Sequence, residues 1–199
     1  MRLAESCRTG ALPTPCFLPL DTVSAVSGPQ CRGRSVQLEI EVDGWPEPAG
    51  NGDWETLASR AAEAVASVEA SLANPRLEAS ILFTSDAEVH ELNKGWREKD
   101  KPTNVLSFPM LERDELVALP SDGPPVLLGD IALAHETCAR EAGEKNATLE
   151  DHATHLVIHG LLHLAGLDHE ISPADAQEME SLELKALALL GLPDPYGDA

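Results

Sequence analysis

The segment HGLLHLAGLDH, residues 159–169, constrains the fold of this chain more than any other feature of the sequence. Residues four apart in an α-helix lie on one face, so His159 and His163 can direct their ring nitrogens at a single point. Gly166 can end the helix and reverse the chain, which returns His169 towards the same point. The pattern therefore predicts a central helix that carries three imidazoles to its C-terminal end and to the turn after it.

These three histidines are predicted to hold one metal ion. Three neutral imidazoles around a tetrahedral ion leave the fourth position open for water or substrate, which is typical of catalytic zinc sites. Other divalent transition metals accept the same ligands. The spacing is also that of the metzincin proteases, but Gly160 stands where those enzymes carry their catalytic glutamate. The motif thus predicts a zinc-type site without the base of a peptidase.

Two further residues near the motif are candidates for supporting roles. His155 pairs with His159 by the same spacing, but it lies two turns, about 11 Å, from His163. Both cannot bind one ion at about 2.1 Å, so His155 is predicted to be an outer partner of the site or a packing residue. Asp168 either fixes the tautomer of a ligand histidine, acts as a base, or closes the turn after Gly166.

The charge of the chain does not by itself favour a nucleic-acid partner. The 199 residues carry a formal net charge of −20, whereas phosphate binding depends mainly on Lys and Arg. One segment departs from this balance: between Leu92 and Pro109 the basic side chains outnumber the acidic ones. This segment is either a solvated loop or a basic patch beside the metal site. Its basic residues are Lys94, Arg97, Lys99 and Lys101.

Composition places the chain among cytoplasmic proteins with reduced cysteines. No stretch reaches the roughly 18 apolar residues of a membrane span. The four cysteines contain no C-x-x-C pair and no readable disulfide framework. Residues 1–34 are rich in Pro, Ser, Gly and Cys and are predicted to be a disordered extension. Residues 35–199 are predicted to form a single catalytic metal-binding domain.

Hydrophobic periodicity predicts an α+β fold, with a small mixed β-sheet packed with helices. Strands are expected over 36–42, 78–84, 104–108 and 127–134. Helices are expected over 54–73, 86–92, 135–143, 149–165 and 173–191, and residues 109–126 are expected to be a loop. Glu178, Glu180 and Glu183 are assigned to the solvated face of the last helix. The segment NVLSFP is either an ordinary paired strand or an edge strand that lines an extended substrate.

Three segments of the sequence resemble one known family. HGLLHLAGLDH, LNKGWREKDKPTNVLSFP and LLGDIALA are similar, in the same order and at similar spacing, to the YbeY family of metal-dependent endoribonucleases. The resemblance covers residues 36–191. It implies an α+β fold with the metal at the base of a cleft.

The resemblance also implies a substrate and a set of site residues. The metal-binding histidines of the family fall on His159, His163 and His169, and its important arginine falls on Arg97. The implied substrate is single-stranded RNA, notably the 3′ end of the 16S rRNA precursor. The implied partner is the small ribosomal subunit, with neither DNA nor membrane expected. Lys99 and Lys101 would hold phosphates.

One departure from the family pattern concerns Asn104, because an aspartate frequently follows Pro-Thr in the family. Asn104 either removes a catalytic carboxylate or only shapes the following strand. Two other functions remain open at this point. One is a non-catalytic ribosome-assembly factor with a structural metal, and the less favoured one is a metallopeptidase. Whether water or the ribose 2′-OH is the nucleophile is also left open.

Overall fold

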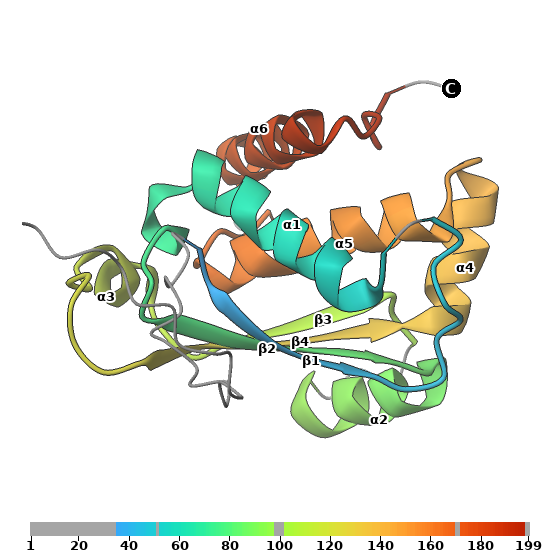
Figure 1. Ribbon diagram of the computed structural model, residues 1–199, viewed down its shortest axis with the longest axis horizontal. Coiled ribbons are helices and arrows are strands. Elements are labelled where there is room, and N and C mark those ends of the chain that lie inside the picture. Colours follow the sequence, from blue (N-terminus) through green and yellow to red (C-terminus); the bar gives the residue numbers. More distant parts are fainter. Residues whose placement is uncertain (1–34, 51, 98–101, 170–171, 198–199) are drawn as a thin grey trace, which may run out of the picture. The chain divides into compact units, whose positions relative to one another are not determined.

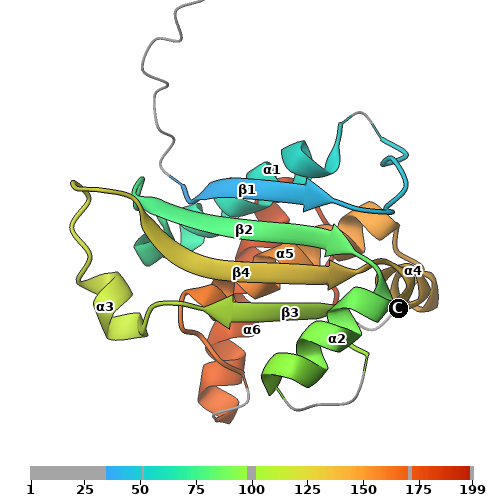
Figure 2. The same ribbon diagram turned by 90° about the horizontal axis from the view of Figure 1, so that it is seen from below.

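A four-stranded mixed sheet organises the protein, seen here in a computed structural model that describes residues 35–197 except 51, 98–101 and 170–171. In spatial order the strands are β1 (Gln37–Val42), β2 (Leu77–Thr84), β4 (Val126–Ala134) and β3 (Val105–Pro109) (Figure 2). The first three strands are parallel and β3 runs antiparallel to β4. The predicted α+β class with a mixed sheet is confirmed. The predicted extension, residues 1–34, lies outside the described residues.

The two faces of the sheet are covered unequally (Figure 1). On one face lie α1 (Trp54–Val68) and α5 (Leu149–Leu164), with α6 (Pro173–Leu190) packed beyond them. On the opposite face lies α2 (Asp86–Arg97). The main core fills the first of these faces, so α5 is the helix that connects the core to the predicted metal site.

Most residues of the helix α5 are buried, including the polar His152 and His155. It begins at Thr148, whose side chain accepts a hydrogen bond from the backbone N–H of Asp151 at 3.0 Å. It ends just before Gly166, which adopts a left-handed φ of 78°. A Cβ at Gly160 would lie 2.9 Å from Cδ1 of Ile131, so the helix lies very close to β4. The predicted start and end of this helix are confirmed.

Two segments differ from the sequence-based prediction. The helix α2 continues to Arg97, so Lys94 and Arg97 belong to a helix and not to a loop. Burial of Val89 and Asn93 on one side of α2 explains why the helix continues. The short helix α3 (Arg113–Val117) forms within the predicted loop. A reciprocal capping box between Glu112 and Glu115, together with buried Leu116, stabilises it.

The remaining elements are close to prediction. The expected first helix ends at Val68 and is followed by a 3₁₀ turn, η1 (Ala70–Leu72). The helix α4 (His135–Glu144) follows β4 directly. Within the described part of the chain, no helix is long and apolar enough to cross a membrane.

Candidate metal centre

The three histidines of the sequence motif meet at the C-terminal end of α5. One ring nitrogen from each of His159, His163 and His169 lies within 4.8 Å of the other two. The Nε2 atoms of His159 and His163 are 3.1 Å apart. Tetrahedral ligands held at about 2.1 Å from an ion lie about 3.4 Å from one another. The separation of the two helical histidines therefore fits ligands of one metal ion, and His169 closes the third side.

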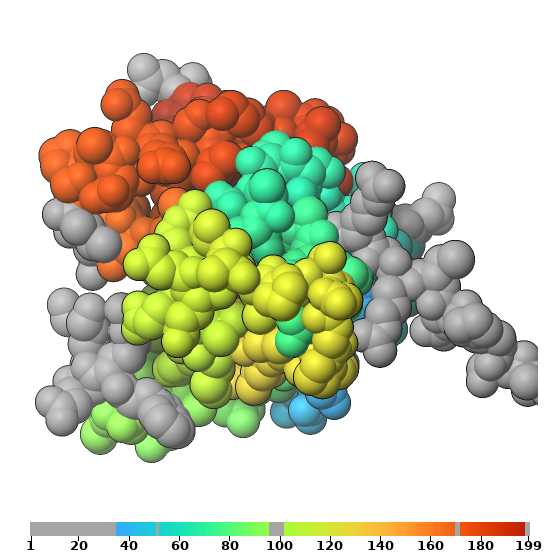
Figure 3. Space-filling model, turned by 90° about the vertical axis from the view of Figure 1, so that its left-hand side faces the viewer, coloured from blue at the N-terminus to red at the C-terminus, as the bar shows by residue number. Residues whose placement is uncertain are grey.

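The turn that carries His169 is braced by a residue that sequence reasoning missed. Arg113, at the start of α3, donates a hydrogen bond to the carbonyl of Ala165 at 2.8 Å and pairs with Glu69 at 3.2 Å. A Cβ at Gly166 would lie 2.8 Å from Cβ of Arg113. Figure 3 shows this side of the molecule, with the orange segment after α5 beside the yellow-green region of α3. The turn after α5 is therefore stabilised by contacts with Arg113 as well as by the left-handed conformation of Gly166.

The histidines open onto a cleft of about 510 Å³ whose other wall is the edge strand β3. The carbonyl of Asn104 accepts from the N–H of Ala134, and the N–H of Met110 donates to Leu128. In an antiparallel pair, alternate residues bond to the partner strand. Ser107, an odd number of residues from both, therefore directs its N–H and carbonyl away from β4 and along the cleft.

The environment of His163 favours its neutral form. Burial, followed by the nearby charges of His159 and His169, lowers the pKa of His163 to about 4. A neutral imidazole has the free lone pair that a metal requires. At neutral pH His163 is therefore already in the form that binds metal.

A buried carboxylate stands directly behind His159. Glu183 of α6 accepts from Nδ1 of His159 at 2.7 Å, lies 3.2 Å from Nε2 of His155, and is hydrogen-bonded by the hydroxyl of Tyr196. Burial alone would raise the pKa of Glu183, but the hydrogen bonds from His155, His159 and Tyr196 outweigh it and lower that pKa. The prediction that Glu183 lies on a solvated face is wrong. The spacing from Met179 to Glu183 and Ala186, all buried, is the signal that could have placed it on the inner face.

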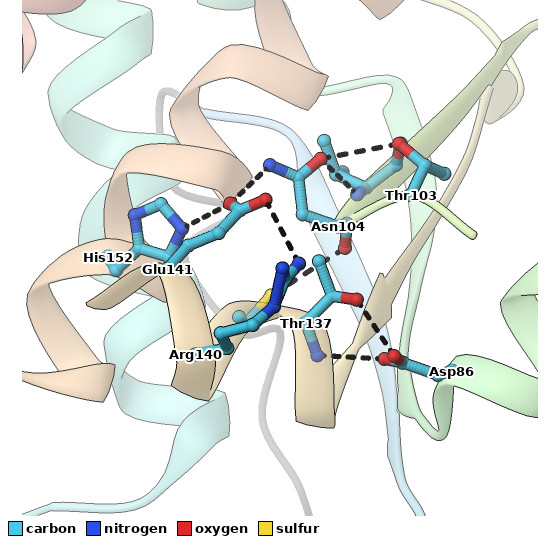
Figure 4. Close-up of polar contacts among 9 residues, drawn as sticks. Asp86, Thr103, Asn104, Thr137, Arg140, Glu141 and His152 are labelled. Atoms are coloured by element: carbon cyan, nitrogen blue, oxygen red, sulfur yellow. Dashed lines mark hydrogen bonds and ion pairs between the residues drawn. The ribbon is translucent and has the colours of Figure 1, made fainter. Parts of the chain in front are cut away.

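The environment of Asn104 explains what this residue does at the start of β3 (Figure 4). Its side-chain amide donates to Glu141 at 2.8 Å, and its Oδ1 accepts from the N–H of Val105 at 2.8 Å. The same oxygen of Glu141 is 3.0 Å from Nε2 of His152. The NH2 group and the oxygen of the Asn104 side chain are thus both used to fix the start of β3. This corresponds to the alternative in which Asn104 only shapes the following strand.

The other predicted site residues are placed to different degrees. Asp168 lines the cleft, and His155 is buried against Glu183 with its Nδ1 unpartnered among the described residues. Arg97 is the last residue of α2, and its side chain is outside the described part of the structure. Lys99 and Lys101 lie outside the described residues.

Comparison with known proteins decides the family. The family model described as Endoribonuclease YbeY matches residues 46–191. A relative from Erythrobacter litoralis, named Endoribonuclease YbeY, is 63% identical over 163 residues, covering 82% of this chain and 99% of the relative. A second relative of that name, from Novosphingobium aromaticivorans, is 58% identical over 160 residues, covering 80% and 95%. The chain belongs to the YbeY endoribonuclease family.

Membership of the YbeY family confirms the resemblance seen in the three sequence segments. The solution structure of TM1509 from Thermotoga maritima also aligns, with a TM-score of 0.49 and 24% identity over 81% of this chain and 100% of that chain. The assignment to the YbeY family therefore rests on the family model and the sequence relatives, and not on this structural similarity.

Proposed function

We propose that this endoribonuclease is zinc-dependent and cleaves single-stranded RNA, with the 3′ end of the 16S rRNA precursor as its substrate. The observation that carries the proposal is the convergence of three imidazoles in a cleft, in a chain of an endoribonuclease family. The small ribosomal subunit would be the partner and the cytoplasm the site of action. Neither DNA nor a membrane is expected to be involved.

In this proposal His159, His163 and His169 hold the ion. Zinc suits three neutral nitrogen ligands, and when bound it would supply Lewis-acid polarisation of a phosphoryl oxygen or activation of water. Arg97 would neutralise negative charge that develops at phosphorus, which a guanidinium does well. Asp168 would orient a ligand histidine from its place in the cleft.

The shape of the cleft supports an extended and unpaired strand as the substrate. The outward N–H of Ser107 gives the β3 wall a donor beside the histidines. Unpaired RNA can present its phosphates and bases separately to such a wall, whereas a duplex cannot. Lys99 and Lys101, which precede β3 in the sequence, would bind phosphates. The strongly acidic remainder of the chain would limit binding of RNA elsewhere.

Gly160 weighs against the metallopeptidase alternative. A side chain at this position would meet Ile131 of β4, with Cδ1 at 2.9 Å and Cγ2 at 3.1 Å. The position that holds the catalytic glutamate in metzincins therefore faces the sheet in this protein. Together with the family assignment, this weighs against peptide hydrolysis by the metzincin mechanism.

The first test is cleavage of an end-labelled single-stranded RNA by wild type and His163→Ala, purified identically. Wild type should cut, and the variant should not, while His90→Ala on α2, outside the cleft lining, should cut normally. Equal cutting by wild type and His163→Ala would place the activity elsewhere. Absence of cutting by both, even on isolated small subunits, would favour the non-catalytic assembly factor. A 2′,3′-cyclic phosphate end would identify the 2′-OH as nucleophile, and a 3′-OH end would identify water.

A further inference from the structure

We infer that Glu183, supported by Tyr196, is a positioning residue that fixes the tautomer of His159 and thereby sets the metal affinity of the histidine cluster. The inference rests on the proposed metal site and adds to it a residue of α6, which lies outside the histidine motif of residues 159–169. The geometry that points to it is a fully buried carboxylate whose one oxygen contacts a cluster histidine and whose other oxygen contacts two further donors.

The direction of the hydrogen bond determines which nitrogen of His159 faces the cluster. An ionised carboxylate can only accept a hydrogen bond, so the Nδ1 of His159, which lies 2.7 Å from Oε1 of Glu183, must carry the proton. In a neutral imidazole the Nε2 then has a free lone pair. That Nε2 is the atom that faces Nε2 of His163 at 3.1 Å. Glu183 therefore presents the correct atom of His159 to the ion.

Burial of the Glu183 carboxylate is energetically costly, which indicates that this residue does more than pack α6 against α5. The side chain of Glu183 is 1% exposed, and burial of a charge is costly unless strong hydrogen bonds satisfy it. Its described partners are two imidazoles and a phenol, none of which is a permanent cation. An apolar residue of similar size would join α5 and α6 at lower cost.

Apolar residues bury α6 in the core independently of Glu183. Met179, Ala186 and Leu187 of α6 are buried in the same core cluster as Ile158 and Leu162 of α5. The helix α6 is therefore anchored in the core on both sides of Glu183 by hydrophobic burial. This permits a test in which the carboxylate is changed and the fold is kept.

Tyr196 completes the arrangement from the segment after α6. Its hydroxyl donates to the Glu183 oxygen that His159 does not use and lies 3.4 Å from Nε2 of His155. This contact restricts rotation of the carboxylate and leaves Oε1 directed at His159. The C-terminal segment thus reaches the metal site indirectly through one buried anion.

The test is a zinc competition titration of the full chain against a chromogenic chelator, with Glu183→Gln compared to wild type. Gln keeps the volume but replaces the anion, and loss of an outer partner of a metal-bound histidine costs roughly 10–100-fold in metal affinity. Glu178→Gln, an exposed glutamate of the same helix, is the matched control and should bind zinc as wild type does. Thermal unfolding of the metal-free proteins checks that the fold is retained.

A second measurement needs no variant and no metal. The ¹⁵N shifts of the His159 ring in metal-free wild type should show a protonated Nδ1 and an unprotonated Nε2. The opposite tautomer would overturn the inference, as would zinc affinity of a folded Glu183→Gln within twofold of wild type. A wild type with the expected tautomer but no zinc affinity would instead contradict the proposed metal site. If Glu183→Gln fails to fold, the ¹⁵N result decides.

Discussion

The two halves of α5 carry the same residue type in opposite roles. In the first half His152 and His155 are buried, and each faces a carboxylate from a neighbouring helix, Glu141 or Glu183. In the second half His159 and His163 face a cleft and turn ring nitrogens towards each other. The spacing along the helix is regular across both halves, so the sequence pattern alone does not separate them. What separates them is whether a carboxylate or open space meets the ring.

The partner helices explain why this division arises. The first half of α5 packs beside α4, whose Glu141 also holds Asn104 and thus the start of β3. The second half packs on β4 through Gly160 and Leu164, and its histidines open onto the cleft lined by β3 and the turn after Gly166. His159 belongs to both environments, because Glu183 holds one nitrogen and the cluster uses the other. One turn of helix therefore separates the histidines buried against carboxylates from the proposed metal ligands.

The largest expected effect is on zinc affinity, and it is measured by comparing His159→Ala with His155→Ala. Removing His159 deletes a ligand, so zinc affinity should fall by more than the roughly 100-fold that marks the upper range for outer partners. Removing His155 leaves all three cluster nitrogens in place, and zinc affinity should fall less than about tenfold. A competition titration of both variants measures this, and equal losses would remove the distinction between the two halves.

The next effect concerns the turn that carries His169, and two glycines provide a matched comparison. Gly166 and Gly191 both follow helices with left-handed φ values, of 78° and 73°. A methyl group at Gly166 would also meet Arg113 at 2.8 Å, whereas nothing lies within 4 Å of one at Gly191. Gly191→Ala should lower the unfolding free energy by about 1 kcal/mol. Gly166→Ala should lower it by about 2–3 kcal/mol and also weaken zinc binding, because His169 moves.

Urea unfolding and zinc titration of the two glycine variants test this pair. Similar stability losses, with zinc affinity unchanged in both, would show that Arg113 adjusts and that the turn does not position His169.

The sequence predicted the parts of this molecule that depend on local spacing. The limits of α5, the cluster of His159, His163 and His169, and the mixed strand pattern follow from periodicity and from Gly166. Contacts between distant segments were not predictable in this way. Glu183 meets His159 across 24 residues and Asn104 meets Glu141 across 37, and neither polar pair has a spacing rule. The short helix α3 was missed because one buried leucine and a capping box stabilise it.

A smaller effect is expected from Asn104→Asp, which tests the first half of α5. The new carboxylate would lie at hydrogen-bond distance from Glu141, now 2.8 Å from the Asn104 amide. Like charges there and the lost donor should destabilise the fold by about 1–2 kcal/mol at neutral pH. The double variant Asn104→Asp, Glu141→Gln restores a donor and should recover most of this loss. Chemical denaturation of wild type, the single variant and the double variant checks this prediction. An Asn104→Asp variant as stable as wild type would mean that the start of β3 does not depend on this contact.

The smallest effect is a pH dependence that comes from the same half of the helix. Burial lowers the pKa of His152 below 6.5, although its hydrogen bond with Glu141 opposes the shift. The unfolded chain then binds a proton more readily than the folded protein, so the stability that neutral His152 contributes is present above pH 6.5 and is lost as the pH falls below it. His152→Gln cannot titrate and should lack this loss.

The difference in unfolding free energy between wild type and His152→Gln isolates this contribution, because all other titrating groups are common to both. Measured on metal-free protein, the difference should shift against wild type as the pH falls from about 6.5 to about 5, by less than the change expected for Asn104→Asp. A difference that does not vary with pH would show that His152 titrates equally in the folded and unfolded chain. Such a result would also weaken the contrast between the two halves of α5, since burial against Glu141 would then have no effect on the ring.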